Sequence, residues 1–176
     1  ITIPACLRFL SESFDLKLIL VGDRDAIYSQ IGDRLSQYSD RIEVIHTTQV
    51  VGMDEAPQSA MRSKKDSSMR VAINQVQTGK AHGVVSAGNT GALMATARYV
   101  LRTMDGIDRP AIAKLMPTMK GETCMLDLGA NVECTPEHLL QFGVMGAQLM
   151  RGVVGKSTPT VGILNIGSED IKGNET

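Results

Sequence analysis

Short apolar runs alternate with helical patterns of hydrophobic residues along this chain, and this alternation limits the fold more than any other feature. The runs typical of strands cover residues 16–21, 42–46, 82–85, 111–116, 123–128 and 160–166. Helical periods cover residues 3–14, 25–38, 68–77, 92–101 and 135–150. Strands that alternate with helices form a largely parallel sheet covered by helices. The sequence therefore predicts an α/β fold, in which residues 111–128 form a hairpin with Gly121 in its turn.

Length and composition favour one globular domain and exclude some function classes. A chain of 176 residues with 43% hydrophobic and 21% charged residues can bury a sizeable core. The formal net charge of −1 gives no bulk attraction to nucleic acid. Only 3% of the residues are aromatic, which argues against base-stacking surfaces. We therefore expect no nucleic-acid partner.

The cysteines and the two ends of the sequence give expectations about compartment and completeness. The three cysteines contain no CxxC pair, which is typical of reduced thiols in the cytoplasm. No uninterrupted apolar run is long enough to cross a bilayer. The sequence starts at Ile1 within a helical pattern and stops at Thr176 without a closing element. We therefore expect one α/β domain over residues 1–176 that is a segment of a longer cytoplasmic protein.

The stretch SAGNTGA, residues 86–92, is the strongest candidate for a binding site. It joins the apolar run at 82–85 to the helical pattern at 92–101, and a helix start offers unpaired N–H groups and a positive dipole end to an anion. Gly88 and Gly91 would allow close backbone approach, while Asn89 and Thr90 add donors or a helix cap. An ordinary helix cap whose glycines serve only the turn is the alternative interpretation.

Small polar loops follow three of the predicted strands, at residues 86–89, 127–131 and 165–170. Ligands of open α/β sheets bind beyond the carboxyl ends of parallel strands. We therefore expect the three loops to meet at one edge of the sheet and to form one site there.

Several other kinds of site are disfavoured by the sequence. There is no G-x-G-x-x-G after a strand and no Walker A loop, and the tripeptide at 155–157 resembles only the tail of one. Cys134 and His138 lie four residues apart but provide half a metal site, so we assign no metal. No motif marks a Ser-His-Asp or Cys-His nucleophile. The basic residues Arg62, Lys64 and Lys65 form either a solvated face or a dock for an acidic partner or phosphate.

Six motifs closely resemble the bacterial phosphate acyltransferase family PlsX, of fatty-acid and phospholipid synthesis. They are LVGD (20–23), SKKDSSM (63–69), SAGNTGALM (86–94), GIDRPA (106–111), LDLGANVECTPEHLLQFGVMG (126–146) and LNIGSEDIKGNE (164–175). They occur in order over nearly the whole chain. The Asp-Ala-Met-Gly-Gly-Asp opening expected of the family and its C-terminal half are missing, which agrees with the expectation of a segment.

The resemblance implies a reaction, a fold and partners. The reaction is acyl-(acyl carrier protein) plus inorganic phosphate to acyl phosphate plus free carrier protein, without a cofactor. The implied fold is a three-layer α/β/α sandwich related to phosphotransacetylase and isopropylmalate dehydrogenase, incomplete here. The family also implies a homodimer, peripheral association with the inner face of the cell membrane, and a membrane glycerol-3-phosphate acyltransferase that receives the product.

In this reaction phosphate is the nucleophile, so the protein has to hold phosphate and stabilise an oxyanion. The predicted phosphate cradle comprises Ser86, Gly88, Asn89, Thr90 and Gly91. The predicted catalytic donors are Asn131, Lys172 and Asn174. Asp127, Ser168 and Glu169 complete the predicted phosphate and substrate site, in which the acids Asp127, Glu169 and Asp170 orient the donors rather than bind phosphate. Carrier proteins of this kind are acidic, which gives Arg62, Lys64 and Lys65 a docking partner.

Two further function classes stay open at this point. One is a phosphotransacetylase-like enzyme that uses acyl-coenzyme A, and the other is a non-catalytic module that binds phosphate or acyl phosphate. Incubation with acetyl-coenzyme A or long-chain acyl carrier protein separates the first alternative, and phosphate binding without thioester cleavage would favour the second. The most useful single observation is phosphate-dependent release of free thiol from acyl carrier protein.

Overall fold

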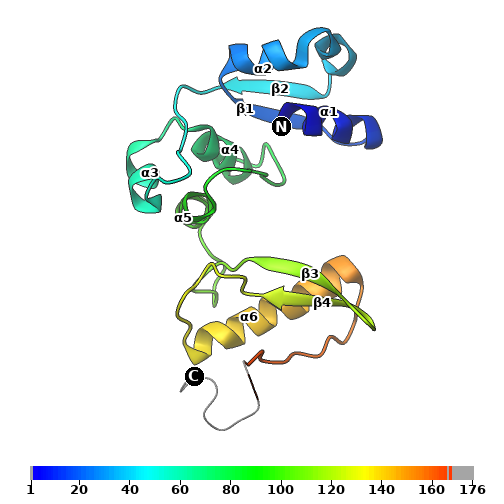
Figure 1. Cartoon of the computed structure of the whole chain (residues 1–176), viewed down its shortest axis with the longest axis vertical. Coiled ribbons are helices and arrows are strands. Elements are labelled where there is room, and N and C mark those ends of the chain that lie inside the picture. Colours follow the sequence, from blue (N-terminus) through cyan, green and yellow to red (C-terminus); the bar gives the residue numbers. More distant parts are fainter. Residues whose placement is uncertain (1, 166, 168–176) are drawn as a thin grey trace. The chain divides into compact units, whose positions relative to one another are not determined.

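The computed structural model describes residues 2–165 and Gly167, and the chain divides into two compact units, Ile1–Arg102 and Thr103–Thr176. The first unit holds most of the helices and a parallel strand pair, and the second holds a hairpin and a long helix (Figure 1). The expectation of a single α/β domain stays a prediction.

The first unit is built around a two-stranded parallel sheet. Strand β1 (Leu18–Gly22) pairs with β2 (Ile42–His46) so that Leu18 lies opposite Ile42 and Gly22 opposite His46. The helical elements of the unit are α1 (Thr2–Glu12), α2 (Arg24–Ile31), the 3-10 helix η1 (Gly32–Tyr38), α3 (Pro57–Ser63), α4 (Ser68–Gln77) and α5 (Thr90–Leu101). Gly32 ends α2 because its φ of 57° is left-handed, and the chain continues as the 3-10 helix.

Two hydrophobic clusters stabilise the first unit. In the first cluster, Ile3 and Leu7 of α1 pack with Leu20 of β1 and with Ile27 and Ile31 of α2. The second joins three helices through Ala60 of α3, Met69 and Ile73 of α4, and Ala92 and Val100 of α5. The apolar residues recur at helical spacing along α1 and α4, which is why one face of each helix is buried. The second cluster fixes α5 against α3 and α4.

Arg41 fastens the end of α1 to the start of β2. Its Nε and Nη2 donate to the carbonyl oxygen of Leu16 at 3.0 and 2.9 Å, and Nη1 donates to the carbonyl of Leu10 at 3.1 Å. Nη2 also donates to the carbonyl of Ser13. The guanidinium thus supplies donors to carbonyl groups that lie at and beyond the helix terminus.

Replacing Arg41 with Met should lower the free energy of unfolding by roughly 1.5–3 kcal/mol, the usual range for hydrogen bonds to a charged group. Arg8 provides a matched control, because it forms an exposed pair with Glu12 in which the side chains are 80% and 61% accessible. Arg8→Met should change stability by less than about 0.5 kcal/mol. Urea unfolding of the two variants measures the difference, and equal losses would contradict the role given to Arg41.

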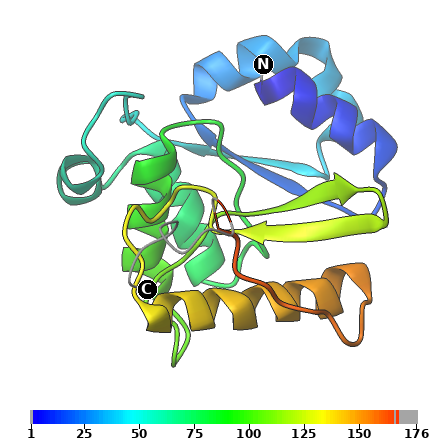
Figure 2. The same cartoon turned by 60° about the horizontal axis from the view of Figure 1, so that its bottom comes forward.

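The second unit packs one helix against an antiparallel hairpin. Strands β3 (Ala113–Thr118) and β4 (Gly121–Leu126) form the hairpin, with Gly121 at a φ of 117° in its turn. Helix α6 (Pro136–Leu149) runs along the hairpin and continues as a short π-helix, η2 (Met150–Val154) (Figure 2). Its start is a capping box, in which Thr135 and His138 bond to each other's backbone N–H group.

The predicted fold class is confirmed, since the chain combines helices with a small parallel sheet, as expected for an incomplete α/β/α fold. The predicted hairpin, the cap at Thr135 and the strand at 42–46 are confirmed as well. The strand predicted at 82–85 is wrong, because that segment pairs with no strand of the described chain and Val85 is fully exposed. The strand predicted at 160–166 is also wrong over 160–165, where most side chains are exposed.

Candidate functional site

The first turn of α5 presents unpaired backbone donors, as the motif at 86–92 predicts. Asn89 caps the helix, because its Oδ1 accepts from the N–H of Ala92 at 2.9 Å and its carbonyl accepts from that of Leu93. Within the described part of the chain, the N–H groups of Thr90 and Gly91 have no partner. Two donors at the positive end of the helix dipole are therefore available to an anion.

The side-chain amide of Asn89 forms hydrogen bonds within the protein. Its Nδ2 lies 3.1, 3.1 and 2.9 Å from the carbonyl oxygens of Gly52, Met53 and Glu55, and the residue is only 8% exposed. Both amide hydrogens therefore point into a neighbouring loop. In this structure Asn89 positions the cradle, and the backbone donors of Thr90 and Gly91 are the groups that remain free.

The other predicted cradle residues shape the approach to this turn. A Cβ at Gly91 would lie 2.9 Å from Cγ of Pro57, so only glycine allows α5 to start this close to α3. The hydroxyl of Ser86 accepts from the N–H of Gly88 at 3.2 Å, which closes the turn before the cap. Thr90 is exposed. The stretch thus combines a closed turn, a tightly packed helix start and an accessible hydroxyl.

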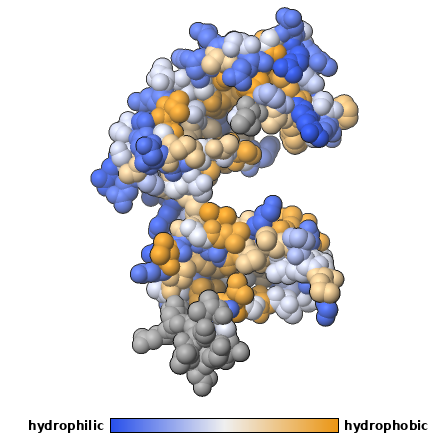
Figure 3. Space-filling model, in the orientation of Figure 1, coloured by the Kyte–Doolittle hydropathy of each residue, from blue (hydrophilic) through white to orange (hydrophobic). Residues whose placement is uncertain are grey.

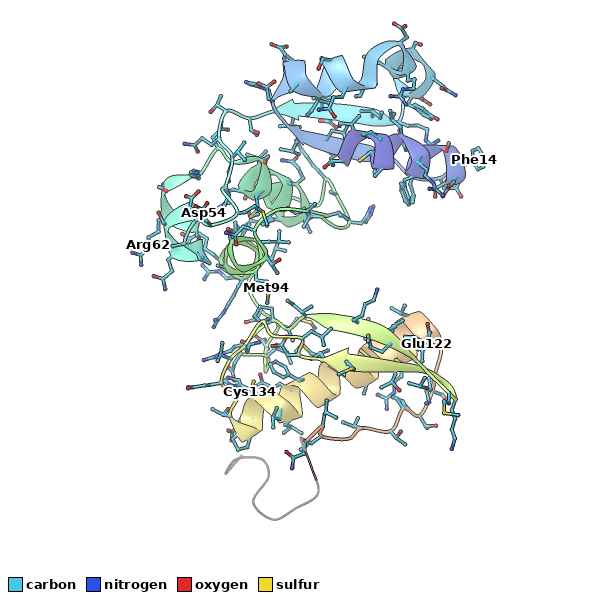
Figure 4. All side chains as sticks on the ribbon, in the orientation of Figure 1. Phe14, Asp54, Arg62, Met94, Glu122 and Cys134 are labelled. Atoms are coloured by element: carbon cyan, nitrogen blue, oxygen red, sulfur yellow. The ribbon has the colours of Figure 1, made fainter. Side chains whose placement is uncertain are left out.

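An ion pair holds the loop that Asn89 contacts. Nζ of Lys64 donates to Oε2 of Glu55 at 2.5 Å and to the carbonyl of Val50 at 2.6 Å, and the same Oε2 accepts from the N–H of Gly52. The hydrogen bond from Lys64, with that from Gly52, lowers the pKa of Glu55. Lys64 therefore supports the loop beside the cradle, and its predicted role in carrier docking stays a prediction. Arg62 and Lys65 are exposed (Figure 4 labels Arg62).

The sequence offered little to identify this support. Asp66 accepts from the N–H and hydroxyl of Thr48 at 2.8 and 2.6 Å, and Gln49 accepts from the N–H of Asp66. Segment 47–56 is thereby tied to the start of α4. The polar composition of 47–57 indicated a connection, but the partners lie 17 or more residues away and no local motif marks them.

Asn89→Asp tests the double use of the Asn89 side chain. The carboxylate can still cap α5, but it cannot donate and would face the carbonyls of Gly52, Met53 and Glu55. Asn89→Ser keeps the cap without the negative charge. We expect Asn89→Ser to cost roughly 1–3 kcal/mol of unfolding free energy for the unpaired carbonyls, and Asn89→Asp to cost more. Urea unfolding measures both variants, and an Asp variant as stable as wild type would contradict this geometry.

In the second unit, Asp127 organises the loop after β4. Its Oδ1 accepts from the N–H of Ile112 at 2.8 Å, and its Oδ2 accepts from the N–H and the Nδ2 of Asn131 at 2.7 and 3.1 Å. Partial burial raises the pKa of Asp127, but these bonds and one from Ala130 outweigh it and lower the pKa overall. Asp127 thus holds Asn131 in place, and the role predicted for Asp127 in the site stays a prediction.

Asn131 is held from two sides. Its Nδ2 donates to Asp127 and also to the carbonyl of Pro110 at 3.0 Å, so both amide hydrogens have acceptors within the loop. In Asn131, as in Asn89, the side-chain amide that was predicted to bind a ligand donates its hydrogen bonds to other groups of the protein. Whether the two loops share a site stays a prediction, as do the predicted roles of Ser168, Glu169, Lys172 and Asn174, which lie outside the described residues.

Metal and membrane features can be stated for the described part of the chain. No group of three or more His, Cys, Asp or Glu side chains there could hold a metal ion. His138 Nδ1 accepts from the N–H of Thr135 at 3.1 Å, so that nitrogen serves the α6 cap. No helix within residues 2–165 is both long and apolar enough to cross a membrane.

The family model described as fatty acid synthesis protein matches residues 1–176. The chain belongs to this family. It is similar to proteins named phosphate acyltransferase from Chromobacterium violaceum, Halorhodospira halophila and Legionella pneumophila, at 63%, 57% and 54% identity over 175 residues. These alignments cover 99% of this chain and 51% of each relative, so the chain spans about half the length of the curated relatives it matches. The resemblance to the PlsX family is thereby confirmed.

Proposed function

We propose that the protein containing this chain is a phosphate acyltransferase that converts acyl-(acyl carrier protein) and inorganic phosphate to acyl phosphate and free carrier protein. The observation that carries the proposal is the pair of unpaired N–H groups on Thr90 and Gly91, in a family whose relatives are named phosphate acyltransferase. A helix start of this kind suits a phosphate dianion, because both the donors and the dipole favour negative charge.

The chemistry needs no nucleophile from the protein. A phosphate oxygen attacks the thioester carbonyl carbon and forms a new carbon–oxygen bond. The carbon–sulfur bond of the resulting intermediate then breaks, and the thiolate leaves and takes up a proton. The protein has to hold phosphate in line with the carbonyl and stabilise the oxyanion between these steps. In the proposal the start of α5 holds phosphate, and the roles predicted from the sequence for Asn131, Lys172 and Asn174 stay predictions.

The remaining parts of the proposal concern assembly. The family resemblance supports a homodimer, peripheral association with the inner face of the cell membrane, and delivery of acyl phosphate to a glycerol-3-phosphate acyltransferase in phospholipid synthesis. A cytoplasmic location agrees with cysteines that form no disulfide among the described residues.

The full-length protein should release free thiol from acyl carrier protein only when phosphate is present, with one acyl phosphate formed per thiol. A thiol reagent and hydroxylamine trapping of the acyl phosphate measure the two products. Acetyl-coenzyme A serves as the comparison substrate. Turnover of acetyl-coenzyme A alone would favour a phosphotransacetylase-like enzyme, and phosphate binding without thioester cleavage would favour a binding module.

Arg62 and Lys65 are the proposed docking residues for the acidic carrier protein. Exposed charges mainly steer encounter and are screened by salt. Changing both to Ser should raise the KM for the acyl carrier protein several-fold at low salt and flatten its salt dependence, while a small acyl thioester is unaffected. Changing Lys114 and Lys120 to Ser removes the same charge from exposed positions elsewhere and is the matched control. Equal losses in the two double variants would rule out a specific dock.

A further inference from the structure

Two strongly exposed apolar side chains stand out on the polar loop between β2 and α3. Val50 is 72% and Met53 is 71% exposed, while Val51 between them packs against the cluster of α3, α4 and α5. Their neighbours in the loop include Asp54, which Figure 4 labels beside α3. Large apolar side chains left in water are a cost that contact with an apolar ligand would relieve.

This loop is fixed next to the first turn of α5. The carbonyl of Met53 lies 3.1 Å from Nδ2 of Asn89, and Asn89 directly precedes Thr90, whose N–H is unpaired. The carbonyl of Val50 is held at 2.6 Å by Nζ of Lys64. The backbone at both ends of the exposed pair is therefore anchored, and Met53 belongs to the immediate surroundings of the anion-accepting turn.

The reaction itself requires an apolar neighbour at this place. A phosphate bound at Thr90 and Gly91 attacks a carbonyl carbon within bonding distance, and the alkyl chain of the substrate starts at that carbon. The alkyl chain of the substrate therefore has to extend from the carbonyl carbon along the protein surface beside this turn. The loop that Asn89 binds carries polar side chains and the exposed Met53 and Val50, and apolar side chains of this kind suit an alkyl chain.

We propose that Met53, together with Val50, contacts the alkyl chain of the acyl thioester and contributes to the preference for acyl-chain length. This inference rests on the proposed function and adds residues to it. Methionine suits the task, because its flexible thioether adapts to irregular apolar surfaces. Both residues contact the substrate, and neither takes part in bond making or breaking.

Met53→Ser and Val50→Ser in the full-length protein test the proposal with a short-chain and a long-chain saturated acyl carrier protein. The kcat/KM for the long chain should fall by roughly tenfold relative to the short chain, the effect of losing a few methylene contacts. The KM for phosphate should not change, and Met53→Leu should retain the preference for the long chain.

Phe14→Ser is the matched control, because Phe14 is 81% exposed and follows α1, at the far end of the same unit from α5 in Figure 4. It should leave the ratio of the two kcat/KM values unchanged. Equal losses on both chain lengths, or no loss on either, would overturn the proposal while acyl phosphate formation by wild type still upholds the proposed function. Absence of acyl phosphate from the wild-type reaction would overturn both.

Discussion

The amide of Asn89 is the contact on which the predicted phosphate cradle depends. One oxygen caps α5 through the N–H of Ala92, and one nitrogen bonds to three carbonyls of a loop 34 to 37 residues earlier in the sequence. Only a side chain with a donor and an acceptor can do both. The loop and the helix start are therefore one rigid feature, and the free N–H groups of Thr90 and Gly91 keep their direction because of it.

The second unit uses the same principle with different residues. Asp127 accepts three hydrogen bonds from Ile112 and Asn131, and Asn131 spends both amide hydrogens on Asp127 and Pro110. In both loops the side chains that look like ligand donors hold the backbone in place. In the proposed site, anion binding is thereby left to backbone N–H groups, which lose no side-chain rotamer entropy, and to cationic side chains, which add a full charge. Apolar surface is visible on both units in Figure 3, and Leu140 and Val144 of α6 are 71% and 51% exposed.

Helix starts and buried helix faces could be predicted from the sequence, because they depend on residues close together in the chain. Thr135 with Pro136 marks the start of α6, and the apolar period of α4 marks its buried face, because caps and periodicity act within one or two turns. The failure at 82–85 has the opposite cause, since a strand needs a partner and an apolar tetrapeptide does not specify one. The contacts of Asn89 and Lys64 span 9 to 37 residues, so the sequence indicated the cradle but not what positions it.

Charge near the start of α5 has to be balanced if a phosphate is to bind there. Hydrogen bonds from Lys64 and Gly52 lower the pKa of Glu55, so its carboxylate stays ionised at neutral pH beside a loop that Asn89 binds. An unpaired carboxylate at this place would repel phosphate. The ammonium of Lys64, at 2.5 Å, cancels that charge, and both side chains are mostly covered, at 30% and 20% exposure, which limits screening by solvent. The ion pair therefore has two consequences: it fixes the loop, and it balances the charge of Glu55 near the start of α5.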